Sequence, residues 1–101
     1  MASAESSMRA RVRVLYFASA REAVEGIPEE WFEVNGRGLM TTTPTLEDLA
    51  NALRKAHGGA LAGLCDICAF AVNEEYAPAD LAATKLKTGD VVAIIPPISG
   101  G

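Results

Sequence analysis

The sequence predicts an α+β fold in which one long helix lies across one face of a small mixed sheet of four to five strands. A clear amphipathic helix starts near Thr45, and the other apolar runs are short and end at turn residues, as strands do. The first run, residues 11–17, and the last, residues 91–95, are apolar on both faces, which favours adjacent parallel positions in the middle of the sheet. One helix covers only one face, so we expect the second apolar face to receive a partner.

The N-terminal residues are mainly small and polar. We expect a flexible lead-in over residues 1–10, with a domain that begins at residue 11. Residues 11–17 then form the first strand, with Val12, Val14 and Tyr16 on one face.

A short helix and a second strand are expected next. Residues 18–25 contain helix formers with Ser19 as a candidate cap. Residues 31–34 form a strand that ends at the turn signal Asn35-Gly36. The segment 36–44 is the least informative one, and it fits either an extra edge strand or a loop.

The main helix has well-marked ends. Thr45 is a good N-cap, and the acidic Asp48 lies three positions further on. Gly58 follows the last turn as a stop signal, and His57 there is interpreted as a favourable charge at a helix C-terminus, not as a ligand. The apolar stripe of this helix consists of Leu46, Leu49, Ala50, Leu53 and Ala56.

The C-terminal part is expected to add three strands. Residues 67–72 and 91–95 form the longer two, and residues 76–77 form a short returning strand. The connections are residues 60–66, the turn 73–75, a helical turn within 78–87 that is anchored by Leu81 and Leu86, and the tight turn 88–90.

Composition restricts the class of protein. The 101 residues suffice for one domain with a small core. A net charge of -4 with nine basic residues argues against a nucleic-acid-binding surface and favours partners with basic patches. No apolar run approaches the ~18 residues of a membrane span, and the start lacks the apolar segment of a secretory signal. We therefore expect a cytosolic protein that contacts neither nucleic acid nor membrane.

Cys65 and Cys68 form a lone C-x-x-C pair. A zinc site needs two further ligands, and the single histidine, His57, falls at a predicted helix end. A redox pair normally opens a helix, whereas Cys68 leads into a strand-like run. We interpret both residues as buried free thiols and expect no metal site.

No known catalytic constellation is found in the sequence. It contains no phosphate-binding loop of the G-x-x-x-x-G-K-[ST] type and no G-x-G-x-x-G. Ser99 has no base near it in sequence. The remaining reactive group is the terminal carboxylate of Gly101.

The last six residues, 96–101, are expected to form a projecting tail. Pro96 and Pro97 end the last strand and stiffen the exit, while Gly100 and Gly101 lack a Cβ and fit a narrow channel. The plain alternative is a frayed terminus. A carboxylate is a poor acyl donor, so a partner must activate it, most simply as an acyl-adenylate. The product is either an isopeptide bond to a lysine or a thiocarboxylate, which indicates a carrier domain.

Three segments carry a resemblance to a known family. Residues 14–18 (VLYFA), 72–76 (VNEEY) and 89–101 (GDVVAIIPPISGG) are similar to the small, sulfur-carrier subunits of molybdopterin synthases. The resemblance covers residues 11–101, and the diproline before the glycines is its specific part. A terminal Gly-Gly alone also fits ubiquitin-type modifiers and the sulfur carriers of other pathways. Two features depart from the family pattern: the loop 36–44 is longer than usual, and the cysteine pair is additional.

The resemblance implies a β-grasp, ubiquitin-like fold over residues 11–95 and a function for the tail. It implies that an activating enzyme uses ATP to adenylate Gly101, which then becomes a thiocarboxylate. The large subunit holds the catalytic residues, so this chain is not an enzyme by itself; it donates sulfur to precursor Z, cyclic pyranopterin monophosphate, commonly within a heterotetramer. No permanently bound cofactor is implied. The inserting residues are Gly100, Ser99, Ile98, Pro97 and Pro96.

A docking patch is expected at the root of the tail. If the first and last strands are parallel, Phe17 and Ile95 lie at the same end of the sheet, and the resemblance adds Tyr76 beside the turn. We interpret these three residues as the contact for the large subunit; the alternative is that they are ordinary core. A ubiquitin-type modifier and a plain interaction domain with an inert tail remain the competing functions.

Overall fold

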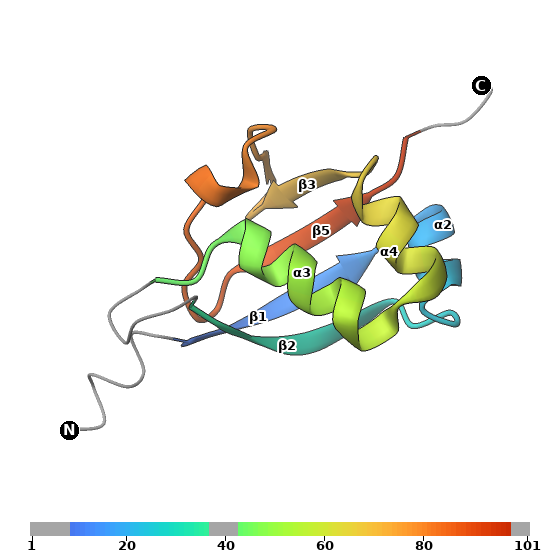
Figure 1. Ribbon diagram of the computed structural model, residues 1–101, viewed down its shortest axis with the longest axis horizontal. Coiled ribbons are helices and arrows are strands. Elements are labelled where there is room, and N and C mark those ends of the chain that lie inside the picture. The colour runs from blue at the N-terminus through green and yellow to red at the C-terminus, as the bar shows by residue number, and fades with distance from the viewer. Residues whose placement is uncertain (1–8, 37–42, 98–101) are drawn as a thin grey trace.

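The computed structural model describes residues 9–36 and 43–97, which form a five-stranded sheet with helices across one face (Figure 1). The strand order is β2-β1-β5-β3-β4. Among the described residues, no helix has the length and apolar character that a membrane span requires. The elements are β1 (Arg9–Tyr16), α2 (Ala18–Ala23), β2 (Glu29–Asn35), α3 (Leu46–His57), α4 (Gly59–Cys65), β3 (Ala69–Val72), β4 (Glu75–Tyr76), the 3-10 turn η1 (Leu81–Ala83) and β5 (Val91–Ile95).

The first and last strands are neighbours in the middle of the sheet. β1 and β5 pair in parallel, with Val14 opposite Val92 and Tyr16 opposite Ile94. β2 and β3 flank them in antiparallel pairing. The predicted α+β fold, the mixed sheet and the parallel central pair are confirmed.

Helix α3 begins as the sequence predicts. The Thr45 hydroxyl accepts a hydrogen bond from the backbone N–H of Asp48, and the Asp48 carboxylate accepts one from the Thr45 N–H, which completes a capping box. The helix ends at His57 before Gly58. Four of the five predicted stripe residues are buried, namely Leu46, Leu49, Ala50 and Leu53, whereas Ala56 is exposed.

The sheet starts earlier than predicted. Arg9 and Ala10, assigned above to the lead-in, already pair with β2, and Ala10 is buried. The cap predicted for the short helix was wrong: α2 has Phe17 at its N-cap without a side-chain hydrogen bond, because Ser19 already lies inside the helix. Most of the loop before α3, residues 37–42, lies outside the described residues.

Of the segment predicted as a connection, residues 60–66, all but the last residue belong instead to helix α4. Its glycines and short length hide the helical signal. Leu61 and Cys65, four positions apart, are both buried, so packing against the core holds a segment of weak intrinsic propensity in a helix.

A polar cluster ties the end of α3 to the sheet. The Tyr16 hydroxyl donates a hydrogen bond to the Glu30 carboxylate, and His57 Nε2 lies 2.7 Å from the same carboxylate oxygen. Burial raises the pKa of Tyr16 far above its usual value, and the Glu30 hydrogen bond adds to this effect. His57 is therefore paired across the core with β2, in addition to its predicted place in the last helical turn.

Candidate docking face and C-terminal tail

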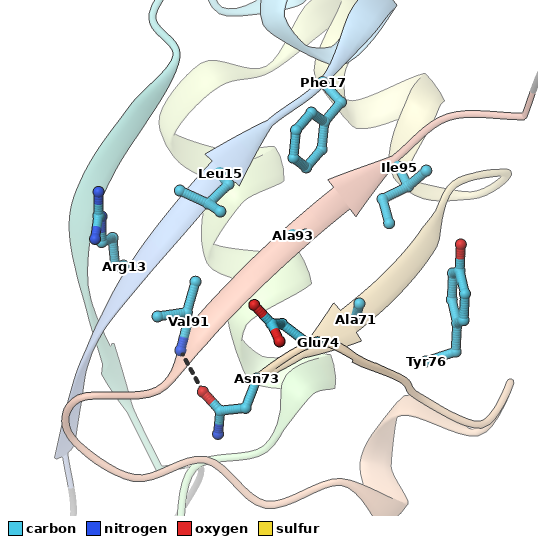
Figure 2. A pocket seen from close by; sticks show the side chains of 10 residues that line it. All are labelled: Arg13, Leu15, Phe17, Ala71, Asn73, Glu74, Tyr76, Val91, Ala93 and Ile95. Carbon is cyan, nitrogen blue, oxygen red and sulfur yellow. Dashed lines mark hydrogen bonds between the residues drawn. The ribbon is translucent and has the colours of Figure 1, made fainter.

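The sheet face away from α3 and α4 has an open, mainly apolar hollow (Figure 2). The side chains along each strand point alternately to the two faces of the sheet, which explains why the open face is apolar. In β5, Val92 and Ile94 point into the core and are fully buried, so Val91, Ala93 and Ile95 point to the open face and are half-buried. Leu15 of β1 and Ala71 of β3 extend the same surface on either side.

The structure places all three residues of the predicted docking patch around this hollow. Phe17 is 41% exposed and Tyr76 is 73% exposed, so neither is a core residue. Ile95 is half-buried and lies between them in Figure 2. The sequence prediction that these residues come together is therefore matched by their positions.

The tail leaves the sheet at the Phe17–Ile95 end of the hollow. Because β1 and β5 are parallel, both strands end there, and the Phe17 N–H donates to the Ile94 carbonyl at 3.4 Å. Pro96 is buried against the domain and Pro97 is exposed, so the first residue of the predicted tail is anchored in the fold. The other predicted tail residues, Ile98, Ser99, Gly100 and Gly101, lie outside the described residues.

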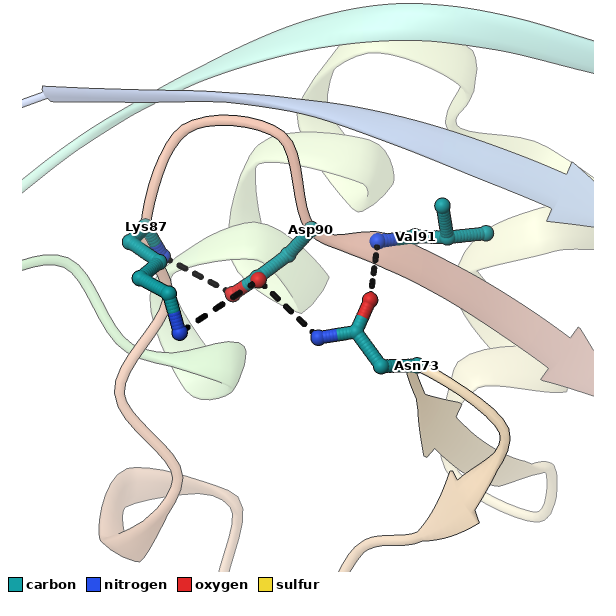
Figure 3. Close-up of polar contacts among 4 residues, drawn as sticks. All are labelled: Asn73, Lys87, Asp90 and Val91. Atoms are coloured by element: carbon teal, nitrogen blue, oxygen red, sulfur yellow. Dashed lines mark hydrogen bonds and ion pairs between the residues drawn. The ribbon is translucent and has the colours of Figure 1, made fainter.

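A polar network holds the β3–β4 hairpin against the start of β5 (Figure 3). Asn73 Oδ1 accepts from the Val91 N–H at 3.0 Å, and Asn73 Nδ2 donates to the Asp90 carboxylate at 3.0 Å. The second Asp90 oxygen accepts from the Lys87 N–H at 2.9 Å, and Asp90 is only 5% exposed. A buried carboxylate with these partners fixes two turns at one edge of the hollow.

Exchanging the two polar residues of this network tests it. Asn73→Asp removes the donor to Asp90 and sets two carboxylates against each other, and Asp90→Asn loses one of its accepting oxygens. Each single change is expected to lower the free energy of unfolding by about 1–2 kcal/mol. The double exchange keeps one donor and the three accepting oxygens, so urea unfolding is expected to show recovery of most of that loss. Strictly additive losses would contradict the pairing.

The β1–β2 part of the open face is charged. Arg13 pairs with Glu29 through Nε at 2.7 Å, and the Arg11 guanidinium lies 4.9 Å from the ring centroid of Trp31. These contacts are exposed and contribute little stability. They place the arginines along the β1–β2 side of the hollow, whose lining includes Arg13.

The cysteine pair lies on the other side of the sheet from the hollow. Both cysteines are free, as predicted, but only Cys65 is buried as expected, whereas Cys68 is half-buried. Burial raises the pKa of Cys68 to about 11 and also raises the pKa of Cys65. Both therefore stay protonated at neutral pH and are weak nucleophiles. Within residues 9–36 and 43–97, no group of three or more His, Cys, Asp or Glu side chains is placed to hold a metal ion.

Comparison with known proteins identifies the family. The model of the ThiS family matches residues 14–101, most of the chain. The chain belongs to the ThiS family. A relative from Chlamydomonas reinhardtii, named as a molybdopterin synthase sulfur carrier subunit, is 48% identical over 92 residues, which are 90% of this chain and 99% of the relative. The resemblance drawn from the sequence is thus confirmed.

Solved structures give the same result for the fold of this ThiS-family chain. SAMP1 from Haloferax volcanii is 28% identical with a TM-score of 0.67, and the match covers 90% of this chain and 99% of SAMP1. A second match, also 28% identical and with a TM-score of 0.56, comes from a complex of subunits 1 and 2 of the molybdopterin-converting factor from Helicobacter pylori. It covers 90% of this chain and 99% of the matched one. The β-grasp, ubiquitin-like fold is confirmed.

The predicted docking patch did not include every residue of the hollow, and the charged residue at its hairpin edge is an example. Glu74 lines it, although its segment was interpreted only as a turn. No local pattern shows this position, because it depends on the β3–β4 register, in which Val72 pairs with Glu75 and leaves a two-residue loop.

Proposed function

We propose that the chain is the sulfur-carrier subunit of a molybdopterin synthase and that Gly101 carries the sulfur as a thiocarboxylate. The observation that carries this proposal is the apolar hollow at the point where β5 leads into the C-terminal segment. The 48% identity to a relative that bears this name supports it.

The chemistry requires two steps at the carboxyl group of Gly101, the first at an oxygen and the second at the carbon. A carboxylate oxygen of Gly101 attacks the α-phosphorus of ATP on an activating enzyme, and pyrophosphate leaves. A hydrosulfide equivalent then adds to the acyl-adenylate carbon, and AMP leaves with the C–O bond electrons. The thiocarboxylate sulfur is a better nucleophile than a carboxylate oxygen, so it can be given to precursor Z in the large subunit.

In this proposal the large subunit docks on the hollow and supplies the catalytic residues. Phe17, Tyr76 and Ile95 provide the apolar contact, and Pro97 to Gly101 enter the active site. Pro96, being buried, sets the direction in which the tail departs. The carrier binds no cofactor of its own and acts in the cytosol.

Mass spectrometry tests the proposal directly. The chain is incubated with an activating enzyme, ATP and a sulfide source, and we expect a mass gain that equals the replacement of one oxygen by sulfur at Gly101. The product is then expected to convert precursor Z when the large subunit is added. A chain that gains no sulfur under conditions that load a known carrier would refute the proposal.

The second candidate is a ubiquitin-type modifier that is attached to lysines through Gly101. The likeness to SAMP1 from Haloferax volcanii supports this alternative, because SAMP1 stands for small archaeal modifier protein 1 and the match covers 99% of that chain. The two functions are separated by their products, since the modifier yields isopeptide-linked conjugates and the carrier yields a thiocarboxylate that is consumed with precursor Z.

A further inference from the structure

We infer that Glu74 determines partner specificity on the docking face, by pairing with a basic side chain that the large subunit places in the hollow. The inference rests on the proposed function and adds the chemistry of the contact. It follows from the conformation of Glu74, its position and its lack of a partner within the chain.

Glu74 occupies a backbone conformation that suits glycine. β3 and β4 pair with Val72 opposite Glu75, so Asn73 and Glu74 alone form the hairpin loop. Both have positive φ, 52° for Asn73 and 73° for Glu74, as the two central residues of a type I′ turn require. Such turns favour Asn-Gly, because asparagine tolerates this region and glycine has no Cβ to strain it. Glutamate at the second position therefore weakens the hairpin.

Nothing within the described part of the chain compensates for this strain. Asn73 uses its amide oxygen and nitrogen in hydrogen bonds to Val91 and Asp90. The Glu74 carboxylate, in contrast, has no hydrogen bond or ion pair with any residue of 9–36 or 43–97. Strained residues without a structural reason cluster at binding sites, so the side chain points to an intermolecular role.

The position of Glu74 indicates which kind of partner group could pair with its carboxylate. In Figure 2 its carboxylate extends from the hairpin toward β5, over a surface of Ala71, Ala93 and Val91. Among the described residues that line the hollow, Arg13 is the cation, and it is already paired with Glu29. The hollow is thus apolar with one uncompensated negative charge. A complementary partner presents an apolar protrusion with an arginine or lysine beside it, and exclusion of water by the apolar contact strengthens the ion pair.

Three variants separate the conformation of Glu74 from its charge. Glu74→Gly relieves the strain and removes the charge, so we expect the Tm to rise by about 4 °C while binding weakens. Glu74→Gln keeps the strained backbone and removes only the charge. Glu75→Gln is the matched control, because Glu75 belongs to β4 and its side chain alternates to the other face.

Isothermal titration with the large molybdopterin synthase subunit from the same organism provides the measurement. We expect Kd to increase about tenfold for Glu74→Gly and Glu74→Gln, which corresponds to about 1.4 kcal/mol, and to stay within about twofold for Glu75→Gln. The wild-type affinity is also expected to fall more steeply with salt than that of Glu74→Gln.

The binding data can contradict either the role of Glu74 or the proposed function, and the two cases are distinguishable. If Glu74→Gln and Glu74→Gly bind as tightly as the wild type, the inference about Glu74 is wrong and the proposed function stands. If the wild-type chain itself does not bind the large subunit, the proposed function fails, and with it the partner assigned to Glu74.

Discussion

Adding one alanine after Gly101 is expected to abolish sulfur transfer while the domain stays folded. The extension converts the Gly101 carboxylate into an amide, which cannot be adenylated. It also places the new carboxylate one residue further along and adds a Cβ where a narrow channel accepts only glycine. Misplacement of a reacting group by even 1 Å costs about 100-fold in rate, so a loss of at least that size is expected in precursor Z conversion.

An alanine added before Met1 is the matched control for this extension. It changes the length of the chain by the same amount at the other terminus, and activity should be unchanged. Circular dichroism checks that both variants fold. Normal turnover by the C-terminally extended chain would mean that the Gly101 carboxylate is not the reacting group.

Placing a charge in the hollow is expected to break the complex with the large subunit. Ile95→Asp and Phe17→Asp each put a carboxylate where apolar contact is proposed, and its desolvation is not compensated. Residues at the centre of an interface contribute about 2–4 kcal/mol, so Kd is expected to rise roughly 30- to 1,000-fold for each variant. Neither side chain is fully buried in the free domain, so both variants should fold.

Ile67→Asp is the control for these charge substitutions. Ile67 is an exposed isoleucine, 61% accessible, beside α2 and α4 on the helix-covered side. It undergoes the same chemical change without contact with the hollow, so binding should be retained. If Ile67→Asp weakens binding and Ile95→Asp does not, the large subunit docks on the helices and the patch assignment is wrong.

Much of the fold follows from local patterns in the sequence. The capping box at Thr45 and the alternation in β5 specify one helix start and two sheet faces, and both are observed. Helix α4 was not predicted because its residues have weak helical propensity, and only contacts from distant parts of the chain stabilise it. Ser19 failed as a cap because local chemistry does not fix whether α2 begins at residue 18 or later.

The residues of the candidate site were also predicted only in part. Phe17 and Ile95 were placed together because parallel pairing of the first and last strands determines where both end. Glu74 was not recognised because its importance depends on the β3–β4 register, which decides that the loop has two residues and that both have positive φ. Register is a tertiary property, and a one-residue shift would move Glu74 away from the hollow.

The parallel pairing of β1 with β5 has a consequence for synthesis on the ribosome. β1 is the first strand to be made and β5 the last, yet they are neighbours at the centre of the sheet. Closing this contact costs the loop-closure entropy of the long intervening chain, and no shorter fragment contains the central pair. A nascent chain that stops before Val91 exposes an unpaired edge on both β1 and β3. The central pair of the sheet can therefore form only after β5 itself has been translated.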